Sequence, residues 1–360
     1  MSEGVEQVGL YGVGHFGYAM LRRLEPRAGT DIALRAFDRN EQVRHALERD
    51  RRHPIHDTES EFSTHVEIVH DVAALMKDLD VLILAVTSNS TREVAEAVGG
   101  QPWSGPLIMV NTAKALDFKT GRRLSEIVAK SIPRPPALYT YAALAGGTIA
   151  SDVLHDQPLG MTIACGDGAT LPRLKRLFGS AQMWVQTTTD LAGVEYAGAL
   201  KNVVSICSGL ARGLGLNFGA QTHLISRIAW EVEDFCVRKL GAERTTFSIG
   251  SQCWGSDLWM SCLGPTRNRE LGEMIGKGAS LDEANLKMAR LNKTVEGVQT
   301  LRAMESIFRE HPDELPLLRA AERVILHAAP ASDLIDALMR DDEVGLSEAE
   351  PQHGETGRGV

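Results

Sequence analysis

The sequence predicts an α/β protein in which a mostly parallel sheet domain is followed by an all-α domain. Short apolar segments alternate with amphipathic segments over the first half of the chain, which is the pattern of βαβ units. A glycine-rich run from Gly12 to Gly17 directly follows the first apolar segment. Beyond about Thr187 the strand-like segments stop, and apolar residues recur at the helical spacing of about 3.6 residues.

The elements follow in order from these patterns. Strands are expected at 5–11, 31–37, 66–69, 79–86, 107–111, 137–144, 160–165 and 183–186. Helices are expected at 16–24, 40–48, 71–77, 91–98 and 121–129, and then at 190–240, 281–288, 295–308, 317–324 and 332–339. We therefore divide the chain into a sheet domain at 1–189, a helical domain at 190–341 and an acidic tail at 342–360, which we expect to be disordered.

The composition is that of an ordinary globular protein, with 43% hydrophobic and 24% charged residues. The net charge of −9 offers no positive field to a nucleic acid, and six acidic residues lie among the last twenty. Five widely spaced cysteines show no zinc or redox motif, which favours reduced thiols in the cytoplasm. No segment approaches the roughly 18 apolar residues of a membrane span, and the first residues do not resemble a signal peptide.

The glycine-rich run has the spacing of a Rossmann-type dinucleotide site. Gly12 permits the tight turn, Gly14 lets a pyrophosphate approach the backbone, and Gly17 lets the helix pack on the strand. His15 and Phe16 lie between the last two glycines and belong to the same candidate site. Asp38 follows Gly17 by 21 positions and ends the second predicted strand, which is the place of a ribose-binding acid.

The choice between the two nicotinamide cofactors depends on two neighbouring residues. Asp38 accepts hydrogen bonds from ribose hydroxyls and repels a 2′-phosphate, which favours NAD. Arg39 is the counterargument, because its guanidinium can pair with the 2′-phosphate of NADP. Asp38 stands at the strand end, so we predict NAD, with NADP as the alternative.

Further polar residues occur where a ligand could be held. Lys114 follows the strand at 107–111, and Gly146 to Thr148 follow the strand at 137–144. Lys201 interrupts an apolar helical segment, so we expect it to be partly buried. Arg267 and Asn268 form a fork suited to a phosphate. Taken singly, each of these residues also fits a turn or a charged surface.

The order of these segments resembles the NAD(P)-dependent glycerol-3-phosphate dehydrogenases, from about Val5 to Met339. The segments that carry the resemblance are GVGHFG at Gly12, DVLILAVTS at Asp80, NTAKAL at Asn111, LAGGTIASD at Leu144, GVEYAGALKNVVSICSGLARGLG at Gly193, GSDLWMSC at Gly255, TRNRELG at Thr266 and TVEG at Thr294. ALKN, RNR and VEG in this order are highly specific.

The resemblance implies hydride transfer between a nicotinamide and dihydroxyacetone phosphate or glycerol 3-phosphate, in a cleft between the two domains. It implies Lys201 as the acid/base, Asp257 beside it and Lys114 at the substrate as catalytic residues. The implied substrate-binding residues are Lys114, Gly146, Thr148, Asn202, Ser261, Thr266, Arg267 and Asn268. The implied cofactor-binding residues are Gly12, Gly14, His15, Phe16, Gly17, Asp38, Arg39, Lys114, Ala150, Arg267, Val295 and Glu296.

We expect no metal, a small phosphorylated substrate as the partner, no nucleic acid and no membrane, with a homodimer allowed. The chain departs from the family in two loops: it has GGTIASD from Gly146 where GPSFAxE is usual, and WGSDL from Trp254 where GLGDL is usual. Thr87 and Ala115 replace a usual proline and glycine. These departures keep two alternatives open: a dehydrogenase of another phosphorylated polyol, ketose or hydroxy acid, and an inactive NAD-binding protein.

Overall fold

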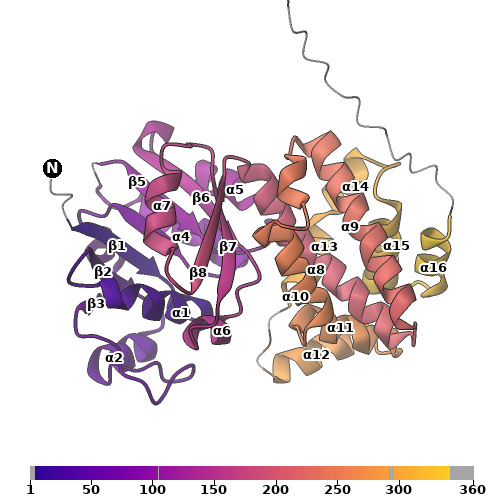
Figure 1. Cartoon of the computed structure of the whole chain (residues 1–360), viewed down its shortest axis with the longest axis horizontal. Coiled ribbons are helices and arrows are strands. Elements are labelled where there is room, and N and C mark those ends of the chain that lie inside the picture. The colour runs from indigo at the N-terminus through magenta and orange to yellow at the C-terminus, as the bar shows by residue number, and fades with distance from the viewer. Residues whose placement is uncertain (1–4, 104, 292, 294, 341–360) are drawn as a thin grey trace, which may run out of the picture.

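The computed structural model describes residues 5–103, 105–291, 293 and 295–340 of the chain. The predicted acidic tail at 342–360 lies outside these residues. A sheet flanked by helices forms one half of the molecule, and a group of helices forms the other (Figure 1). In the described part of the chain, no helix combines the length and the apolar character that crossing a bilayer requires.

Eight strands form one sheet in the order β3-β2-β1-β4-β5-β6-β7-β8. Neighbouring strands are parallel except β6 and β7, which are antiparallel, so the predicted mostly parallel sheet is confirmed. The strands are β1 (Glu6–Tyr11), β2 (Ile32–Phe37), β3 (Val66–Ile68), β4 (Val81–Leu84), β5 (Leu107–Asn111), β6 (Tyr139–Ala145), β7 (Leu159–Cys165) and β8 (Met183–Thr188).

Helices cover both faces of this sheet, because its central strands are apolar on both sides. Every residue of β4 and β5 is buried. The helices of this half are α1 (His15–Leu24), α2 (Glu41–Arg49), α3 (Val72–Met76), α4 (Thr91–Gly99), α5 (Leu124–Ser131), α6 (Ala150–Leu154) and α7 (Leu171–Phe178). Helices α6 and α7, which are short, were not predicted from the sequence.

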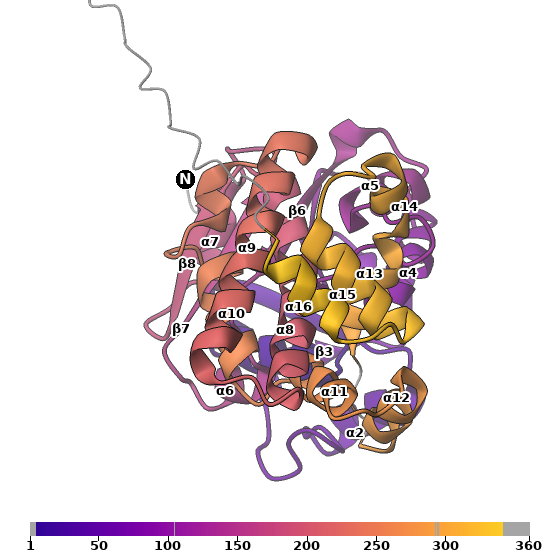
Figure 2. The same ribbon diagram turned by 90° about the vertical axis from the view of Figure 1, so that its right-hand side faces the viewer.

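The second half is helical, as predicted. Its helices are α8 (Leu191–Gly213), α9 (Phe218–Leu240), α10 (Asp257–Leu263), α11 (Arg267–Gly276), α12 (Leu281–Arg290), α13 (Glu296–Ala303), α14 (Glu305–Glu310), α15 (Pro316–His327) and α16 (Ser332–Leu338). In Figure 2, where this half faces the viewer, α15 and α16 stand in front of the other helices. The helix expected over 295–308 is two helices, α13 and α14, which meet at Met304.

Helix α8 is the centre of the helical half. Every residue from Gly193 to Ala211 is buried, as in a helix covered on all sides. It crosses α11 closely: a Cβ at Gly209 would lie 2.0 Å from the carbonyl oxygen of Arg269, and one at Gly272 would lie 2.0 Å from that of Ile206. Glycine at both positions therefore lets α11 lie directly on the helix that carries Lys201.

Candidate active site

The candidate site begins at one edge of the sheet. Strands β1, β4, β5 and β6 are parallel neighbours, so their carboxyl ends meet at this edge. Gly12 follows β1, Ala85 follows β4, Thr112 follows β5 and Gly146 follows β6. Ligands of open α/β sheets bind at such an edge.

The glycine-rich loop forms a cradle that is closed towards the protein and open outwards. Gly12 has φ of 95°, and a Cβ there would lie 2.6 Å from the Ala85 carbonyl oxygen. A Cβ at Gly17 would lie 2.0 Å from the Gly12 carbonyl oxygen, whereas a Cβ at Gly14 would meet nothing within 4 Å. No side chain caps α1, so its first N–H groups can bind an anion. A dinucleotide pyrophosphate fits this cradle.

Asp38 ties the second strand to this loop. Its Oδ2 accepts a hydrogen bond from the Val13 N–H at 2.7 Å, and its Oδ1 accepts one from the Asn40 N–H at 2.8 Å. Arg44, which was not among the predicted site residues, donates to the Asp38 carbonyl oxygen at 2.6 Å. Arg39, the predicted neighbour, is exposed. Asp38 thus lies beside the cradle, where its spacing predicts it, with two cationic side chains nearby.

Three histidines pack at the cradle. Of these, only His15 was among the predicted site residues. His53 accepts the N–H groups of Ile55 and His56 at Nδ1, so its Nε2 donates to the Val13 carbonyl oxygen at 2.8 Å. The rings of His15 and His56 stack with centroids 4.6 Å apart. Burial, followed by the neighbouring His53 and His15, lowers the pKa of His56 to about 4. The loop that follows α2 therefore packs on the glycine-rich loop with a neutral imidazole at His56.

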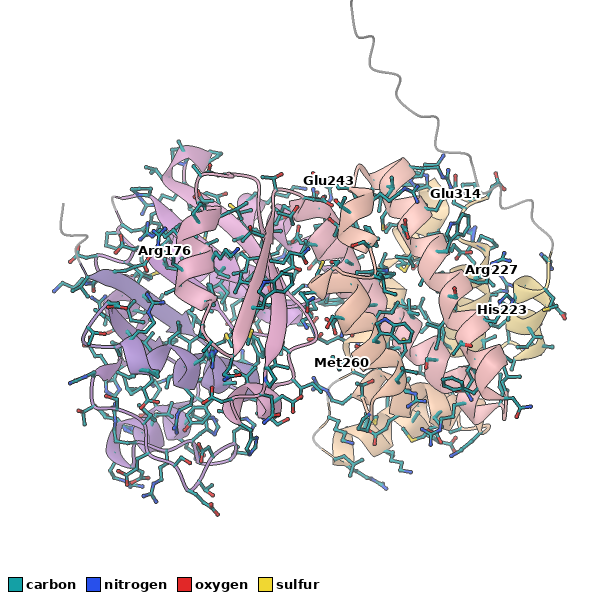
Figure 3. All side chains as sticks on the ribbon, in the orientation of Figure 1. Arg176, His223, Arg227, Glu243, Met260 and Glu314 are labelled. Atoms are coloured by element: carbon teal, nitrogen blue, oxygen red, sulfur yellow. The ribbon has the colours of Figure 1, made fainter. Side chains whose placement is uncertain are left out.

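Two lysines share one carboxylate where the two halves adjoin. Lys201 Nζ donates to Asp257 Oδ1 at 2.9 Å and to the Ser261 hydroxyl at 2.9 Å. Lys114 Nζ donates to Asp257 Oδ2 at 3.0 Å and to the Gly146 carbonyl oxygen. Asp257 is fully buried. The helix that carries it, α10, lies at the seam between the halves, where Met260 is labelled in Figure 3.

Burial and the neighbouring charges shift the pKa values of the ionisable groups in this cluster. Burial opposes ionisation of Asp257, but the two lysines outweigh it and hold the pKa of the carboxyl below its usual value. Burial lowers the pKa of Lys114, although Asp257 partly opposes the shift. Burial raises the pKa of Glu296, which Arg267 and then Lys201 partly oppose. The Lys114 ammonium therefore loses its proton at lower pH than that of an exposed lysine.

A chain of side-chain amides joins the two halves. The Asn202 amide donates to the Lys114 carbonyl oxygen at 3.1 Å, and its oxygen accepts from Asn268 at 2.9 Å. The Asn268 oxygen in turn accepts the Gly297 N–H at 3.0 Å. These bonds set the orientation of both amides. Asn268 consequently has one N–H left with which to contact a ligand.

Arg267 lies near both His15 of the glycine-rich loop and Glu296 of the helical half. It is the first residue of α11, and its charge acts on Glu296 and on His15, whose pKa burial and Arg267 both lower. Thr266, the N-cap of α11, donates to the Ser261 carbonyl oxygen at 2.8 Å. The structure therefore places Arg267 near His15 of the glycine-rich loop, and Glu296 near Arg267 and the two lysines.

The remaining predicted residues lie on several different elements. Thr148 is buried and donates its N–H to the Gly146 carbonyl oxygen at 2.7 Å. Ala150 begins α6, which packs on α1, and Val295 is the N-cap of α13. Phe16 lies on α1. The part of Phe16, Ala150 and Val295 in cofactor binding stays a prediction.

A separate apolar cavity of about 410 Å³ lies on the opposite side of α10. Leu258 and Trp259 of α10 line it, together with Trp230 of α9 and Trp254. Neither Asp257 nor either lysine of the cluster faces this cavity. It is therefore distinct from the candidate site.

Comparisons with known proteins agree along most of the chain. The N-terminal sequence model of NAD-dependent glycerol-3-phosphate dehydrogenase matches residues 7–171, and the C-terminal one matches residues 190–336. A glycerol-3-phosphate dehydrogenase [NAD(P)+] of Prosthecochloris aestuarii is 31% identical over 288 residues, which are 79% of this chain and 84% of that protein. The enzyme of that name from Chlorobium chlorochromatii is 30% identical over 336 residues, 93% of this chain and 98% of its own.

Solved structures show the same fold. The glycerol-3-phosphate dehydrogenase of Coxiella burnetii superposes with a TM-score of 0.81 at 20% identity, covering 93% of this chain and 99% of its own. That of Plasmodium falciparum superposes with a TM-score of 0.85 at 18% identity, covering 94% and 96%. With the sequence matches to both halves, these findings show that the chain belongs to the NAD-dependent glycerol-3-phosphate dehydrogenase family.

Proposed function

We propose that this protein interconverts dihydroxyacetone phosphate and sn-glycerol 3-phosphate by hydride transfer with NAD(H) or NADP(H). One observation carries the proposal: Lys114 and Lys201 meet on Asp257 where the sheet half, which carries the dinucleotide cradle, adjoins the helical half, which carries Arg267. A ketone reduced there has a proton donor at its oxygen and a cation near its phosphate. The names of the relatives supply the substrate class.

The lysine cluster supplies the proton chemistry. The bound nicotinamide supplies the hydride in one direction and accepts it in the other. As the ketone carbon gains the hydride, negative charge grows on the oxygen, and the Lys201 ammonium donates a proton from Nζ to that oxygen. In the reverse direction neutral Lys201 removes the hydroxyl proton. Lys114 adds positive potential at the same oxygen.

The substrate is positioned from the helical half. Arg267 and the free N–H of Asn268 bind the phosphate, and the charge-assisted contact fixes the far end of the substrate. Binding energy from this unreactive group helps to place the carbonyl carbon for hydride transfer. Asp257 orients Lys201 and Lys114, because each of its two oxygens accepts from one of them.

A second substrate is favoured by one observation. The two loops in which the chain departs from the family contact each other: a Cβ at Gly147 would lie 3.3 Å from Ser256 Oγ and 3.5 Å from Asp257 Cα. Both departures therefore meet beside Asp257. A dehydrogenase of another phosphorylated ketose or polyol would differ from its relatives at this place.

A steady-state assay separates these functions. The purified protein is mixed with NADH and, in parallel, dihydroxyacetone phosphate, other phosphorylated ketoses and unphosphorylated dihydroxyacetone. We expect rapid NADH oxidation with dihydroxyacetone phosphate and slow oxidation without the phosphate. Faster turnover of another phosphorylated ketose would establish the second substrate. Cofactor binding without turnover of any of them would show an inactive NAD-binding protein.

The domain division and the cellular setting are part of the proposal. We divide the chain at residues 189/190, which falls between the two family matches at 7–171 and 190–336. A cytoplasmic protein is supported by the cysteines: all five are buried free thiols. A homodimer stays a prediction, which the molecular mass in solution would test.

A further inference from the structure

A buried glutamate on α8 joins the two halves of the molecule at a place outside the lysine cluster. Ser125 donates its N–H to Glu195 Oε1 at 2.8 Å and its hydroxyl to Oε2 at 2.5 Å. Tyr141 donates to Oε1 at 3.4 Å, and Arg123 donates to Oε2 at 3.5 Å. All these partners belong to the sheet half, whereas Glu195 lies six positions before Lys201 on α8.

The contact caps a helix from another part of the chain. Arg123 is the N-cap of α5, and no side chain caps this helix locally. The Glu195 carboxylate accepts the Ser125 N–H in the first turn, where negative charge also interacts favourably with the helix dipole. Burial raises the pKa of Glu195, and the hydrogen bonds of Ser125 oppose that shift. Glu195 therefore acts as the missing cap of α5.

The same face of α8 carries two more attachments to the sheet half. Asn202, about two turns beyond Glu195, donates to the Lys114 carbonyl oxygen at 3.1 Å. Between them, a Cβ at Gly198 would lie 3.5 Å from the Cβ atoms of Lys114 and Ala145. The bonds of Glu195 and Asn202, with the close contact at Gly198 between them, therefore fix both the position of α8 along its axis and its rotation about that axis.

We propose that Glu195 is a positioning residue, whose bonds to Ser125 and Tyr141 hold α8 so that Lys201 meets a substrate lying against the cofactor. Asp257 and Ser261 orient the Lys201 amine, and Asp257 also links it to Lys114 of the sheet half, but these contacts hold only the end of the side chain and not α8 itself. The attachment at Glu195 and the one at Asn202 supply that relation. The proposal rests on the proposed function for its kinetic part only.

The chain offers a matched control. Glu231 on α9 caps α15 in the same way, with the Leu317 and Leu318 N–H groups donating to its two oxygens at 2.9 Å. Both of its helices belong to the helical half. Glu231→Gln therefore alters the same kind of cap, between α9 and α15 of the helical half.

Glu195→Gln, Ser125→Ala and Glu231→Gln are compared with the wild-type protein. For Glu195→Gln we expect kcat to fall by about 10- to 100-fold, since misplacement of a reacting group by about 1 Å can cost 100-fold. The primary deuterium isotope effect on kcat should increase, and the dissociation constant of the cofactor should stay within about twofold. Ser125→Ala should show the same changes on a smaller scale, and Glu231→Gln should lower only the melting temperature.

Hydrogen exchange of the cofactor-free protein tests the attachment independently of turnover. In Glu195→Gln, amides in the first turns of both α5 and α8 should exchange faster, whereas Glu231→Gln should affect α15. Unchanged exchange in α8 would overturn the proposal even if the wild-type protein turned over no substrate. If the wild-type protein is active and both Glu195→Gln and Ser125→Ala keep its kcat and isotope effect, the positioning role of Glu195 is also overturned, whereas the proposed function stands. Ser125→Ala retains the Glu195 side chain, so this variant tests the proposal if Glu195→Gln does not fold.

Discussion

Lys201 and Lys114 bind opposite oxygens of a single carboxylate, Asp257, at 2.9 and 3.0 Å. Two ammonium groups held this close repel each other, and the fully buried Asp257 offsets that repulsion. Removing one partner from a buried charge cluster is costly, because the remaining charges lose their compensation. Each of the three side chains is therefore expected to show a distinct defect when it is changed.

Lys201→Ala should abolish most of the turnover while leaving cofactor binding intact. The side chain donates to Asp257 and Ser261, and loss of a proton-transfer group commonly costs about 10²- to 10⁴-fold in rate. The measurement is kcat with dihydroxyacetone phosphate beside the dissociation constant of NADH. Lys277→Ala, at an exposed lysine at the end of α11, is the control. Near-normal turnover would remove Lys201 from the acid/base role.

Asp257→Asn should shift the pH dependence as well as lower the rate. Burial lowers the pKa of Lys114, and the Asp257 charge raises it again in part. Without that charge the Lys114 ammonium loses its proton at lower pH, so the alkaline decline of kcat/KM for ketone reduction should begin at lower pH. The profile of wild type and variant checks this. A decline at an unchanged pH would show that the Lys114 ammonium does not control it.

Arg267→Ala should raise the KM of the phosphorylated substrate by at least about tenfold, because a hydrogen bond to a charged group contributes about 1.5–3 kcal/mol. Unphosphorylated dihydroxyacetone should be a poor substrate of both forms. Arg290→Ala, at an exposed arginine at the end of α12, is the control. Equal activity on dihydroxyacetone and its phosphate would contradict a phosphate-binding role.

The wild-type enzyme should prefer NADH over NADPH. Asp38 lies at the cradle, bound to the Val13 N–H at 2.7 Å, and its charge repels a 2′-phosphate. Asp38→Ala should reduce the ratio of kcat/KM for NADH to kcat/KM for NADPH. It should also weaken the binding of both cofactors, because the glycine-rich loop loses the bond from Val13 to Asp38. Arg39→Ala should leave NADH kinetics unchanged. A wild-type preference for NADPH would show that the neighbouring arginines outweigh Asp38.

Gly272→Ala should destabilise the protein by about 1–3 kcal/mol, as overpacking of a buried contact does. A Cβ there would lie 2.0 Å from the Ile206 carbonyl oxygen, so α11 must move away from α8. Gly219→Ala on α9 is the control, because a Cβ there meets nothing within 4 Å. Thermal unfolding of both variants measures the difference. Equal melting temperatures would contradict the close helix crossing.

Local patterns in the sequence determined the order of the elements and the dinucleotide cradle. The eight strands alternate with helices in short apolar runs, and Gly12, Gly14, Gly17 and Asp38 are spaced along one strand–loop–helix–strand unit. Such features depend on neighbours within one or two dozen residues, so one chain shows them directly. Lys201, Arg267 and Asn268 stood out from their local sequence, but their roles in the reaction came from the resemblance to a family.

Only the tertiary structure decided which distant side chains meet. Lys114 and Asp257 are 143 positions apart, and they meet because α10 and the loop after β5 lie against each other where the two halves adjoin. The bond from Glu195 to Ser125, the antiparallel pairing of β6 with β7 and the contact of Arg44 with Asp38 were also absent from the sequence analysis. Such partners depend on helix crossing and on strand direction. These are set by the packing of many side chains at once, and no spacing along the chain encodes them.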